Sequence, residues 1–313
     1  MFNSTNLVSD RNPFLSVFLI LLNLFFGFVL VGPLLGIAIG SFFYEGNLLT
    51  DIQNVEEHPD IIGPLLITQG VATFVGLIIF PALHLFAIER RSVSRFFPQQ
   101  PGTLWILASL IVLGVTFMVA ISPLVEWNMN VKFPPFLKEF ETWAREAEDR
   151  TAKLTEAMTS FGSIPELLIG ILVIAVLPAI GEELVFRGMF QNEVYRGTGN
   201  HHVAIWFAAI IFSTIHFQFY GFIPRLLLGA LFGYLYVWSG NLIVPIFAHF
   251  FNNAFGVVMI YLHRHQLTSL NVEDNTAAPL PIVALNVVLT AGLLYYIWKH
   301  YRQLPKTTPD IAS

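Results

Sequence analysis

Residues 12–44, NPFLSVFLILLNLFFGFVLVGPLLGIAIGSFFY, contain no Asp, Glu, Lys or Arg. An α-helix needs about 20 apolar residues to cross the hydrocarbon core of a bilayer, so this stretch is long enough for one pass. It is too long for the apolar region of a signal peptide, and we expect it to be a retained helix. Six further charge-free runs follow in the chain, at 61–88, 96–125, 167–181, 197–224, 226–263 and 275–298.

The composition agrees with a membrane protein. Of the 313 residues, 55% are apolar and 12% are charged, whereas a soluble domain carries about 25% charged residues. The 16 Lys and Arg against 21 Asp and Glu leave a net charge of −5, which disfavours nucleic-acid binding. The absence of cysteine excludes disulfides, thiolate metal sites and a cysteine nucleophile. The sequence therefore predicts an all-α polytopic protein whose partner is the membrane lipid bilayer and not a nucleic acid.

The charge-free runs divide into about eight transmembrane helices. Residues 226–263 suffice for two passes, because the turn signal Gly240-Asn241 divides them. The run 167–181 becomes a full pass only if Glu182 and Glu183 lie within the helix. We expect helices near residues 13–40, 62–88, 103–125, 164–196, 202–219, 222–238, 242–262 and 278–301.

The distribution of Lys and Arg predicts the orientation. The first loop, 44–61, has five acidic residues and no Lys or Arg, whereas the next loop carries three arginines between residues 90 and 95, and the C-terminal tail is basic. Cytoplasmic loops carry an excess of Lys and Arg. Eight passes therefore put both termini on the cytoplasmic side of the cell (inner or plasma) membrane, although Arg225 and Arg264 fall on the other side.

Residues 136–160 interrupt the apolar pattern with a charged segment of helical spacing. Leu137, Phe140, Trp143 and Ala144 form a modest apolar stripe beside six acidic residues. This pattern favours an amphipathic helix that rests on the outer membrane surface or on the loops. A lid over the route of substrate access is the alternative.

Ionisable side chains inside apolar helices are costly, so each one marks a functional site by default. They gather in three constellations of this chain. These are Glu182-Glu183-x-x-x-Arg187 in the fourth helix, Phe212-x-x-x-His216 in the fifth and His249-x-x-x-Asn253 in the seventh.

Helix geometry predicts which of these side chains share a face. Glu183 and Arg187 are i,i+4 neighbours in the favourable order for an ion pair, and Glu182 points about 100° away from Glu183. If the chain turns between residues 196 and 202, Glu182 and His216 each lie about 21 Å from that turn on antiparallel helices. A carboxylate and an imidazole can then meet across the hairpin.

The seventh helix adds a further pair. His249 and Asn253 are i,i+4 neighbours and project together. His249 reaches the depth of Glu182 only if the Gly240-Asn241 turn is sunk into the protein.

Two interpretations compete for the cluster. A buried network that fixes helix packing explains any one of these residues alone. Two adjacent glutamates, an arginine, two histidines and an asparagine are together more than packing needs. Arg187 favours the ionised form of one carboxylate, whereas burial disfavours the ionised form of the other, so their pKa values move apart. A general base requires such a difference.

The three motifs resemble, in order, spacing and intramembrane placement, the signature of the CPBP family. This family comprises the CAAX prenyl endopeptidases and the bacteriocin-processing intramembrane proteases, also called Abi proteins. The resemblance covers about residues 164–262. It implies hydrolysis of a peptide bond by an activated water, in a conical active-site cleft among the fourth, fifth and seventh helices. The implied substrate is a membrane-associated peptide or protein, such as a lipid-modified, CAAX-like one.

The resemblance also implies residue roles. Glu182 resembles the catalytic glutamate that, with His216, orients and deprotonates the water. His249 and Asn253 resemble the groups that stabilise the tetrahedral oxyanion. Glu183 and Arg187 resemble supporting or substrate-positioning residues.

The resemblance leaves the cofactor open, because members have been described both as metalloproteases and as glutamate-dependent proteases without metal. Glu182, His216 and His249 form a chemically sensible zinc set. The chain nevertheless lacks the His-Glu-x-x-His pattern of zinc proteases. We favour the metal-free mechanism, with zinc as the alternative.

Four segments follow from these assignments. We expect a three-helix membrane segment at 1–125, an extramembrane acidic segment at 126–163, a CPBP-like catalytic core at 164–262, and a final helix with a basic cytoplasmic tail at 263–313. The alternative to a protease is a polytopic scaffold or a proton- or ligand-binding, transporter-like protein that uses the same cluster.

Overall fold

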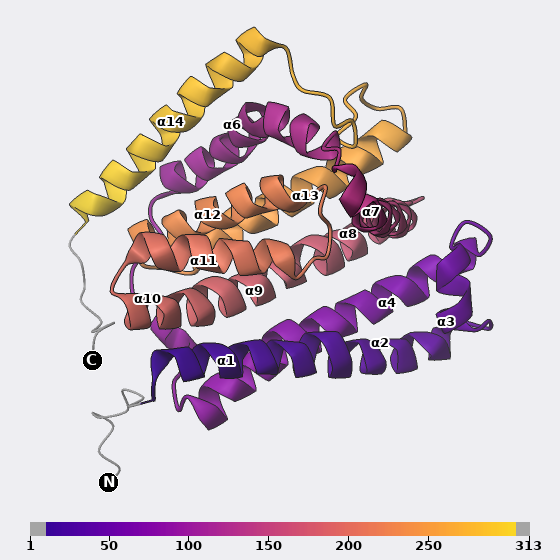
Figure 1. The fold of residues 1–313 in the computed structure, drawn as a ribbon, viewed down its shortest axis with the longest axis horizontal. Coiled ribbons are helices and arrows are strands. Elements are labelled where there is room, and N and C mark those ends of the chain that lie inside the picture. Colours follow the sequence, from indigo (N-terminus) through magenta and orange to yellow (C-terminus); the bar gives the residue numbers. More distant parts are fainter. Residues whose placement is uncertain (1–10, 305–313) are drawn as a thin grey trace.

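The computed structural model describes residues 11–304, and it is helical, without a strand in that range. Seven helical stretches of this range are long and apolar enough to cross a bilayer. The predicted all-α polytopic architecture is confirmed, and each of the eight expected regions contains a helix (Figure 1). The stretches are Pro13–Phe43, Pro59–Ile88, Leu104–Met129, Ile164–Thr198, Phe222–Ser239, Ile243–Arg264 and Leu280–Gln303.

The first half of the chain holds three spans and one extramembrane helix. The first span consists of α1 (Pro13–Leu24), η1 (Phe25–Val31), α2 (Gly32–Gly40) and η2 (Ser41–Phe43). The short helices α3 (Leu48–Asp51), η3 (Ile52–Asn54) and η4 (Pro59–Ile61) lead to the second span, which consists of α4 (Ile62–Thr73), η5 (Phe74–Ile79), α5 (Phe80–Leu83) and η6 (His84–Ile88). After η7 (Val93–Phe96) come α6 (Leu104–Met129), η8 (Pro135–Leu137) and the extramembrane α7 (Lys138–Met158).

The second half begins with the longest span. It consists of α8 (Ile164–Gly170), η9 (Ile171–Val176), α9 (Leu177–Glu183), η10 (Leu184–Gln191) and α10 (Asn192–Thr198). The chain continues through α11 (His201–Thr214), α12 (Phe222–Ser239), α13 (Ile243–Arg264) and α14 (Leu280–Gln303). The segments η1, η5, η6, η9 and η10 are π-helical turns within their spans, and the other η segments are 3₁₀ turns.

The fifth expected helix, 202–219, is shorter than the sequence predicts. α11 ends at Thr214, and the chain then turns through Phe217, whose φ of 53° lies in the left-handed region. Its 14 residues extend about 21 Å, which is less than the roughly 30 Å of a hydrocarbon core. The consequence is that His216 lies in a turn beyond the helix and not on its face.

Small residues bring the first two spans close together. Gly32, Gly36 and Gly40 recur at every fourth position of α2 and face α4. A Cβ on Gly32 would lie 2.6 Å from the carbonyl oxygen of Ala72, so a larger residue would push the helices apart. This pair packs beside the fourth span, while α11, α12 and α13 pack against that span on its other sides (Figure 1).

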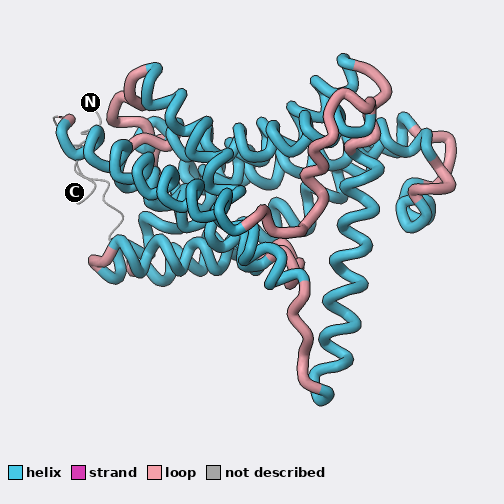
Figure 2. Tube along the Cα trace, turned by 90° about the horizontal axis from the view of Figure 1, so that it is seen from above, coloured by secondary structure: helices cyan, strands magenta, loops and turns pink. Residues whose placement is uncertain are grey.

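The helix α7 crosses the end of the bundle at a steep angle. It is seen end-on in Figure 1 and lengthwise in Figure 2, where its beginning projects away from the other helices. Phe136 just before it is 83% exposed, and Trp143 within it is 46% exposed. These apolar side chains suit the interface between the membrane and water.

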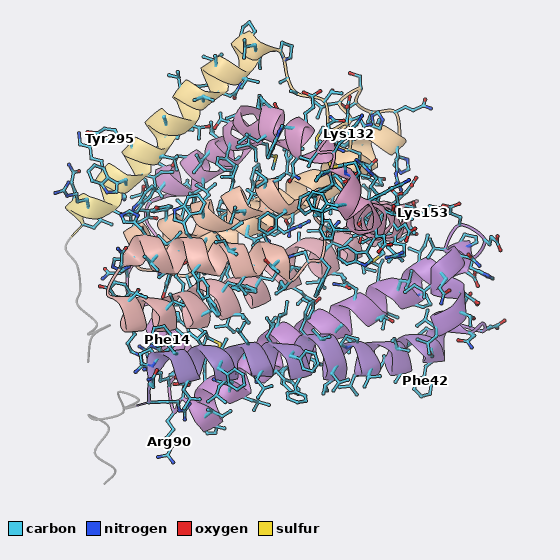
Figure 3. The ribbon with its side chains drawn as sticks, in the orientation of Figure 1. Phe14, Phe42, Arg90, Lys132, Lys153 and Tyr295 are labelled. Carbon is cyan, nitrogen blue, oxygen red and sulfur yellow. The ribbon has the colours of Figure 1, made fainter. Side chains whose placement is uncertain are left out.

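Charged side chains mark the two ends of the bundle. Figure 3 shows Arg90 at the end where α1 begins and α14 finishes, and Lys132 and Lys153 at the opposite end, beside α7. Exposed apolar side chains line the first span between Phe14, near the first of these ends, and Phe42, near the second. The structure therefore has an apolar flank that suits lipid and two polar ends that suit water.

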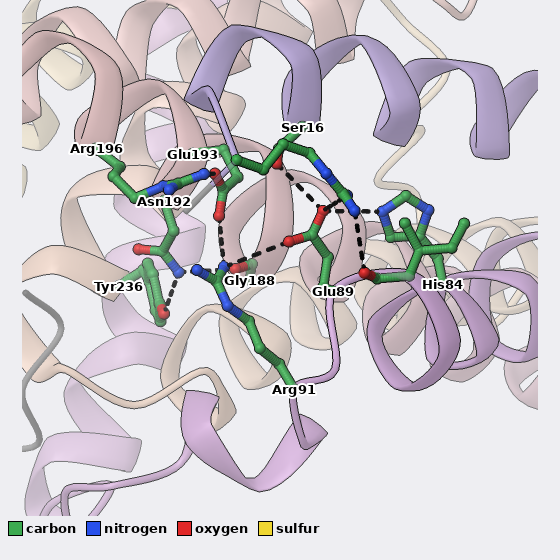
Figure 4. A network of polar contacts seen from close by, with 11 residues as sticks. Ser16, His84, Glu89, Arg91, Gly188, Asn192, Glu193, Arg196 and Tyr236 are labelled. Carbon is green, nitrogen blue, oxygen red and sulfur yellow. Dashed lines mark hydrogen bonds and ion pairs between the residues drawn. The ribbon is translucent and has the colours of Figure 1, made fainter. Parts of the chain in front are cut away.

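A polar network holds the arginine-rich loop at the first of these ends (Figure 4). Glu89 Oε1 accepts hydrogen bonds from Arg11 Nη1 at 2.8 Å and from the Ser16 hydroxyl at 3.2 Å. Arg91 Nη1 donates to Glu193 Oε1 at 2.6 Å. These contacts join the beginning of α1, the end of η6 and α10.

The predicted orientation can be tested with single cysteines, because the chain has none of its own. Arg90 and Lys153 are exposed at opposite ends of the bundle. If both termini are cytoplasmic, a membrane-impermeant maleimide labels Lys153→Cys in intact cells and leaves Arg90→Cys unlabelled. Both variants are labelled after lysis, and the reverse pattern in intact cells would mean that the orientation is inverted.

Candidate active site

Two π-helical turns surround the first motif in the fourth span. Pro178 has no N–H to donate, and η9 ends just before it, at Val176. Glu183 is the last residue of α9, and Arg187 lies within η10. Such wide turns inside α-helices occur frequently at functional sites, because they change which side chains share a face.

Glu183 and Arg187 form a fully buried ion pair, as their spacing predicts. Arg187 Nη1 donates to Glu183 Oε1 at 2.6 Å, and the side chains are 1% and 0% exposed. Arg187 Nη2 donates to the carbonyl oxygen of Gly229 at 2.8 Å. The guanidinium also lies over the ring of Phe212, at 4.8 Å from its centroid. The charge of Arg187 is therefore compensated from α9, α11 and α12 at once.

His249 joins the two adjacent glutamates. Its Nδ1 lies 2.8 Å from Glu183 Oε1, and an ionised carboxylate only accepts, so Nδ1–H donates. Its Nε2 lies 3.7 Å from Glu182 Oε2. The ring stacks on Phe232 with 5.0 Å between centroids. Glu183 thus fixes the imidazole so that Nε2 faces Glu182.

The depth of His249 depends on the turn before α13, and that turn is sunk into the protein. Asn241 is 2% exposed, and its side-chain amide donates to the carbonyl oxygen of Gln99. The backbone N–H of Leu242 donates to the carbonyl oxygen of Phe96 at 2.9 Å. Because this turn is buried, His249 reaches the depth of Glu182, as expected from the sequence.

His216 enters the site from the turn between α11 and α12. Its Nδ1 lies 2.7 Å from the carbonyl oxygen of Phe212 and therefore donates, which leaves a lone pair on Nε2 in the neutral ring. The described residues show no hydrogen bond or ion pair between His216 and Glu182, so the direct contact that the sequence suggested is not formed. The early end of α11 explains this difference, because it moves His216 off the helix.

Four of the six predicted site residues line one cavity of about 600 Å³. They are Glu182, His216, His249 and Asn253, and they come from the fourth span, the α11–α12 turn and α13. Asn253 Nδ2 donates to the carbonyl oxygen of Ile174 at 3.4 Å. Glu183 and Arg187 lie behind this cavity and do not line it. The cleft that we expected among the fourth, fifth and seventh helices is thus present, with further walls from α7 and α12.

The helix α7 covers this cavity. Its second half contributes Glu148, Asp149, Ala152 and Thr155 to the lining. Gln218 Nε2 donates to Glu148 Oε1 at 3.1 Å. Burial raises the pKa of the Glu148 carboxyl, although nearby positive charge opposes this effect. The first half of α7 thus has the exposed stripe of an interfacial helix, and its second half lies where a lid would lie.

Sequence reasoning missed Arg225 as a cavity residue. Arg225 lines the cavity, and its Nη2 donates to Gln218 Oε1 at 2.7 Å. Its Nη1 is buried and has no hydrogen-bond partner among the described residues. The rule that flagged Glu182 applies equally to an arginine in the first turn of an apolar helix. From the sequence, Arg225 counted only as a charge on the non-cytoplasmic side, although it lies within the expected helix 222–238.

The predicted zinc set is not arranged as a metal site. Within residues 11–304, no three His, Asp or Glu side chains converge closely enough to hold a metal ion. Glu182 and His249 approach each other at 3.7 Å, and His216 has no direct contact with either. The present side-chain positions do not fit zinc, and the choice of a metal-free mechanism stays a prediction.

With this geometry in view, comparison with known proteins is informative. Residues 164–255 match the family described as type II CAAX prenyl endopeptidase Rce1-like. This segment therefore resembles the Rce1-like family. The resemblance that the three motifs predicted is thereby confirmed for the part of the chain that carries the cavity's glutamate, histidines and asparagine.

Two bacterial proteins are similar to part of the chain. The uncharacterised protein YpbD of Bacillus subtilis (strain 168) is 35% identical over 29% of this chain and 44% of its own length. The membrane-embedded CAAX protease MroQ of Staphylococcus aureus (strain USA300) is 32% identical over 34% of this chain and 44% of its own. The chain therefore matches less than half the length of these relatives. No solved structure matches it significantly.

The two adjacent glutamates are expected to differ in their effect on stability. Glu183→Ala leaves the buried Arg187 without its carboxylate, a loss that typically costs about 3–5 kcal/mol. Glu182→Ala is the matched control and removes only a longer contact with His249, so we expect a change within about 1 kcal/mol. Thermal unfolding of the purified variants in detergent measures both. Equal destabilisation by the two changes would contradict the structural role of Glu183.

Proposed function

We propose that the protein is an intramembrane endopeptidase that cleaves a membrane-associated peptide or protein with an activated water. One observation carries the proposal: Glu182, His216, His249 and Asn253 share one cavity, which the Rce1-like segment largely forms. A carboxylate, two imidazoles and an amide supply the base and the donors that peptide hydrolysis needs.

In the proposed mechanism, Glu182 and His216 hold the attacking water between them. The neutral His216 accepts a hydrogen bond from the water at Nε2, because its Nδ1–H is engaged by the carbonyl oxygen of Phe212. The water oxygen attacks the carbonyl carbon of the scissile bond, and Glu182 takes the proton that the water releases. A buried carboxylate with few hydrogen-bond donors around it suits this role.

The tetrahedral intermediate carries a negative charge on the former carbonyl oxygen. His249 Nε2, when protonated, and Asn253 Nδ2 are the donors that face this charge from α13. Glu182 then delivers its proton to the amide nitrogen, and the C–N bond breaks to give a carboxylic acid and an amine. The acid passes its proton to the amine, and the products leave as a carboxylate and an ammonium group. Oxyanion donors of this kind typically contribute about 2.7–4 kcal/mol to catalysis.

The buried pair Glu183–Arg187 acts by positioning. Glu183 accepts from both Arg187 and His249, so the imidazole cannot rotate without breaking an ion pair. Arg187 in turn is anchored to Gly229 on α12. We assign both residues to holding His249 in its orientation, since neither lines the cavity.

The position of the cavity suggests how substrates reach it. The lining of the cavity includes α7 and the α11–α12 turn. Figure 1 shows these two elements at the end of the bundle opposite to the beginning of α1. If both termini are cytoplasmic, as the arginine-rich loop predicts, the substrate is presented from the non-cytoplasmic side. A substrate held in the membrane beside α7 fits this geometry.

The decisive variant is Glu182→Gln, which preserves the shape of the side chain and removes the base. We expect peptide cleavage to fall by about 10²–10⁴ fold, because this is the usual contribution of a general base. Comparative proteomics of membrane-protein termini, in cells that carry either form, measures the loss and identifies the substrate. Glu146→Gln, at an exposed position of α7, is the control that keeps activity.

The outcome also separates the protease from the alternative function. Unchanged termini in Glu182→Gln cells, with equal expression, would reject the endopeptidase in favour of a scaffold. Substrate uptake that depends on pH and on Glu182 would instead indicate a proton-coupled transporter.

The metal-free mechanism makes a separate prediction. Purified active protein is expected to contain well below one equivalent of zinc, and a chelator is expected to leave cleavage unchanged, since the carboxylate itself is the base. Elemental analysis of the protein, with its activity before and after chelation, measures both. Loss of activity on chelation and its return with added zinc would show that the metalloprotease alternative is correct.

A further inference from the structure

A second pocket lies at the arginine-rich end of the bundle, away from the catalytic cavity. It has a volume of about 420 Å³ and shares no lining residue with that cavity. Its walls come from α1, the loop after η6 and the fourth span, including Gly188 and Met189 of η10. We call it the arginine pocket, because Arg91, Arg95 and Arg196 line it together with Glu89 and Glu193.

The lining of the arginine pocket carries an excess of positive charge. Two carboxylates oppose its three guanidinium groups, so one positive charge is left over. The two carboxylates are already engaged, since Arg91 Nη1 lies 2.6 Å from Glu193 Oε1 and Arg11 Nη1 lies 2.8 Å from Glu89 Oε1 (Figure 4). The His84 imidazole and these arginines lower the pKa of Glu89 to about 2, so it is ionised at neutral pH.

Arg95 is the guanidinium that lacks a counterion. No carboxylate among the described residues forms an ion pair with it, and it lies 5.8 Å from the centroid of Phe96. Burial lowers the pKa of Arg95, and the nearby Arg91 adds to this effect. A partly buried arginine is usually paired with an acid. In addition, Arg91 Nε and Glu89 Oε2 are buried without a hydrogen-bond partner in the described chain.

The remaining lining of the arginine pocket is apolar and adjoins the membrane-facing flank. Ile20, Leu85, Phe96 and Met189 contribute to it. Phe14, which is 59% exposed, lies against Gly197 of α10 near the same end. An anion that contacts both the arginines and these apolar side chains must itself have a charged part and an apolar part.

We propose that the arginine pocket binds the head-group phosphate of one anionic phospholipid. A phosphodiester carries a single negative charge, which offsets part of the excess positive charge of the lining and of the adjacent Arg11. Its oxygens accept from Arg95 and Arg91, while the acyl chains lie along the apolar flank beside α1. Basic pockets between transmembrane helices at the cytoplasmic side are known sites for anionic head groups. Because Met189 and Arg187 lie in the same π-helical turn, the lipid also braces the span that carries Glu182.

The test compares lipids by thermal unfolding of the full-length protein in detergent. We expect dioleoylphosphatidylglycerol to raise the unfolding temperature by about 3 °C or more. Dioleoylphosphatidylcholine, whose head group is neutral overall, is expected to give a much smaller shift. Sodium phosphate at the same concentration is expected to give none, and an equal shift with phosphate would show that the site takes a free anion and not a lipid.

Arg95→Gln and Arg90→Gln are the matched variants. Both remove one arginine from the same loop, but Arg90 is exposed and points away from the bundle (Figure 3). Arg95→Gln is expected to bind phosphatidylglycerol at least about tenfold more weakly, since a hydrogen bond to a charged group contributes roughly 1.5–3 kcal/mol. Arg90→Gln is expected to bind it like the wild type.

Native mass spectrometry of protein from mixed phosphatidylglycerol and phosphatidylcholine vesicles measures the bound lipid directly. It counts lipid on the folded population, so a less stable Arg95→Gln protein still gives an answer. A single retained phosphatidylglycerol that is lost only with Arg95→Gln supports the site. Equal retention by both variants, or equal retention of the two lipids, would overturn it. The readout does not use peptide cleavage, so it is independent of the proposed protease activity.

Discussion

The site depends on one buried carboxylate. Glu183 is fully buried and accepts from Arg187 at 2.6 Å and from His249 at 2.8 Å, so it joins the fourth span to α13. A buried charge is tolerated only when it is paired and hydrogen-bonded. The arrangement therefore depends on all three residues, Glu183, Arg187 and His249. Glu182, its neighbour in sequence, can face the cavity because Glu183 already compensates the arginine. Two adjacent glutamates therefore have different environments: Glu183 holds buried partners together, and Glu182 lines the cavity.

The sequence predicts most of the membrane architecture. A helix that crosses the bilayer needs about 20 consecutive apolar residues, and such a stretch can be identified without knowing the rest of the fold. Each expected helix is present, and the i,i+4 pair Glu183–Arg187 forms as its spacing indicates. The end of α11 was predicted less well. Residues 215–219 are apolar or neutral, so hydropathy continues through them, whereas the backbone turns at Phe217. Where a buried turn is surrounded by protein, the membrane no longer forces the chain to stay helical.

The candidate site could be predicted only in part, for a related reason. Motif spacing identifies which residues are costly inside a membrane, and Glu182, His216, His249 and Asn253 do line one cavity. It does not tell which of them touch. Glu182 lies near His249 and not against His216, because π-helical turns and the α11–α12 turn shift the side chains by amounts that residue counting cannot supply. Arg225 and the α7 residues reach the cavity through tertiary packing alone.

The fourth span connects two polar regions at opposite ends of the bundle. Its α9 part places Glu182 in a cavity beneath α7, and its α10 part places Glu193 among arginines at the other end. The arginine-rich loop also fixes the turn before α13, since Phe96 and Gln99 accept hydrogen bonds from Leu242 and Asn241. That turn sets the depth of His249. The depth of the His249 imidazole within the bundle therefore depends, through these hydrogen bonds, on the position of the arginine-rich loop.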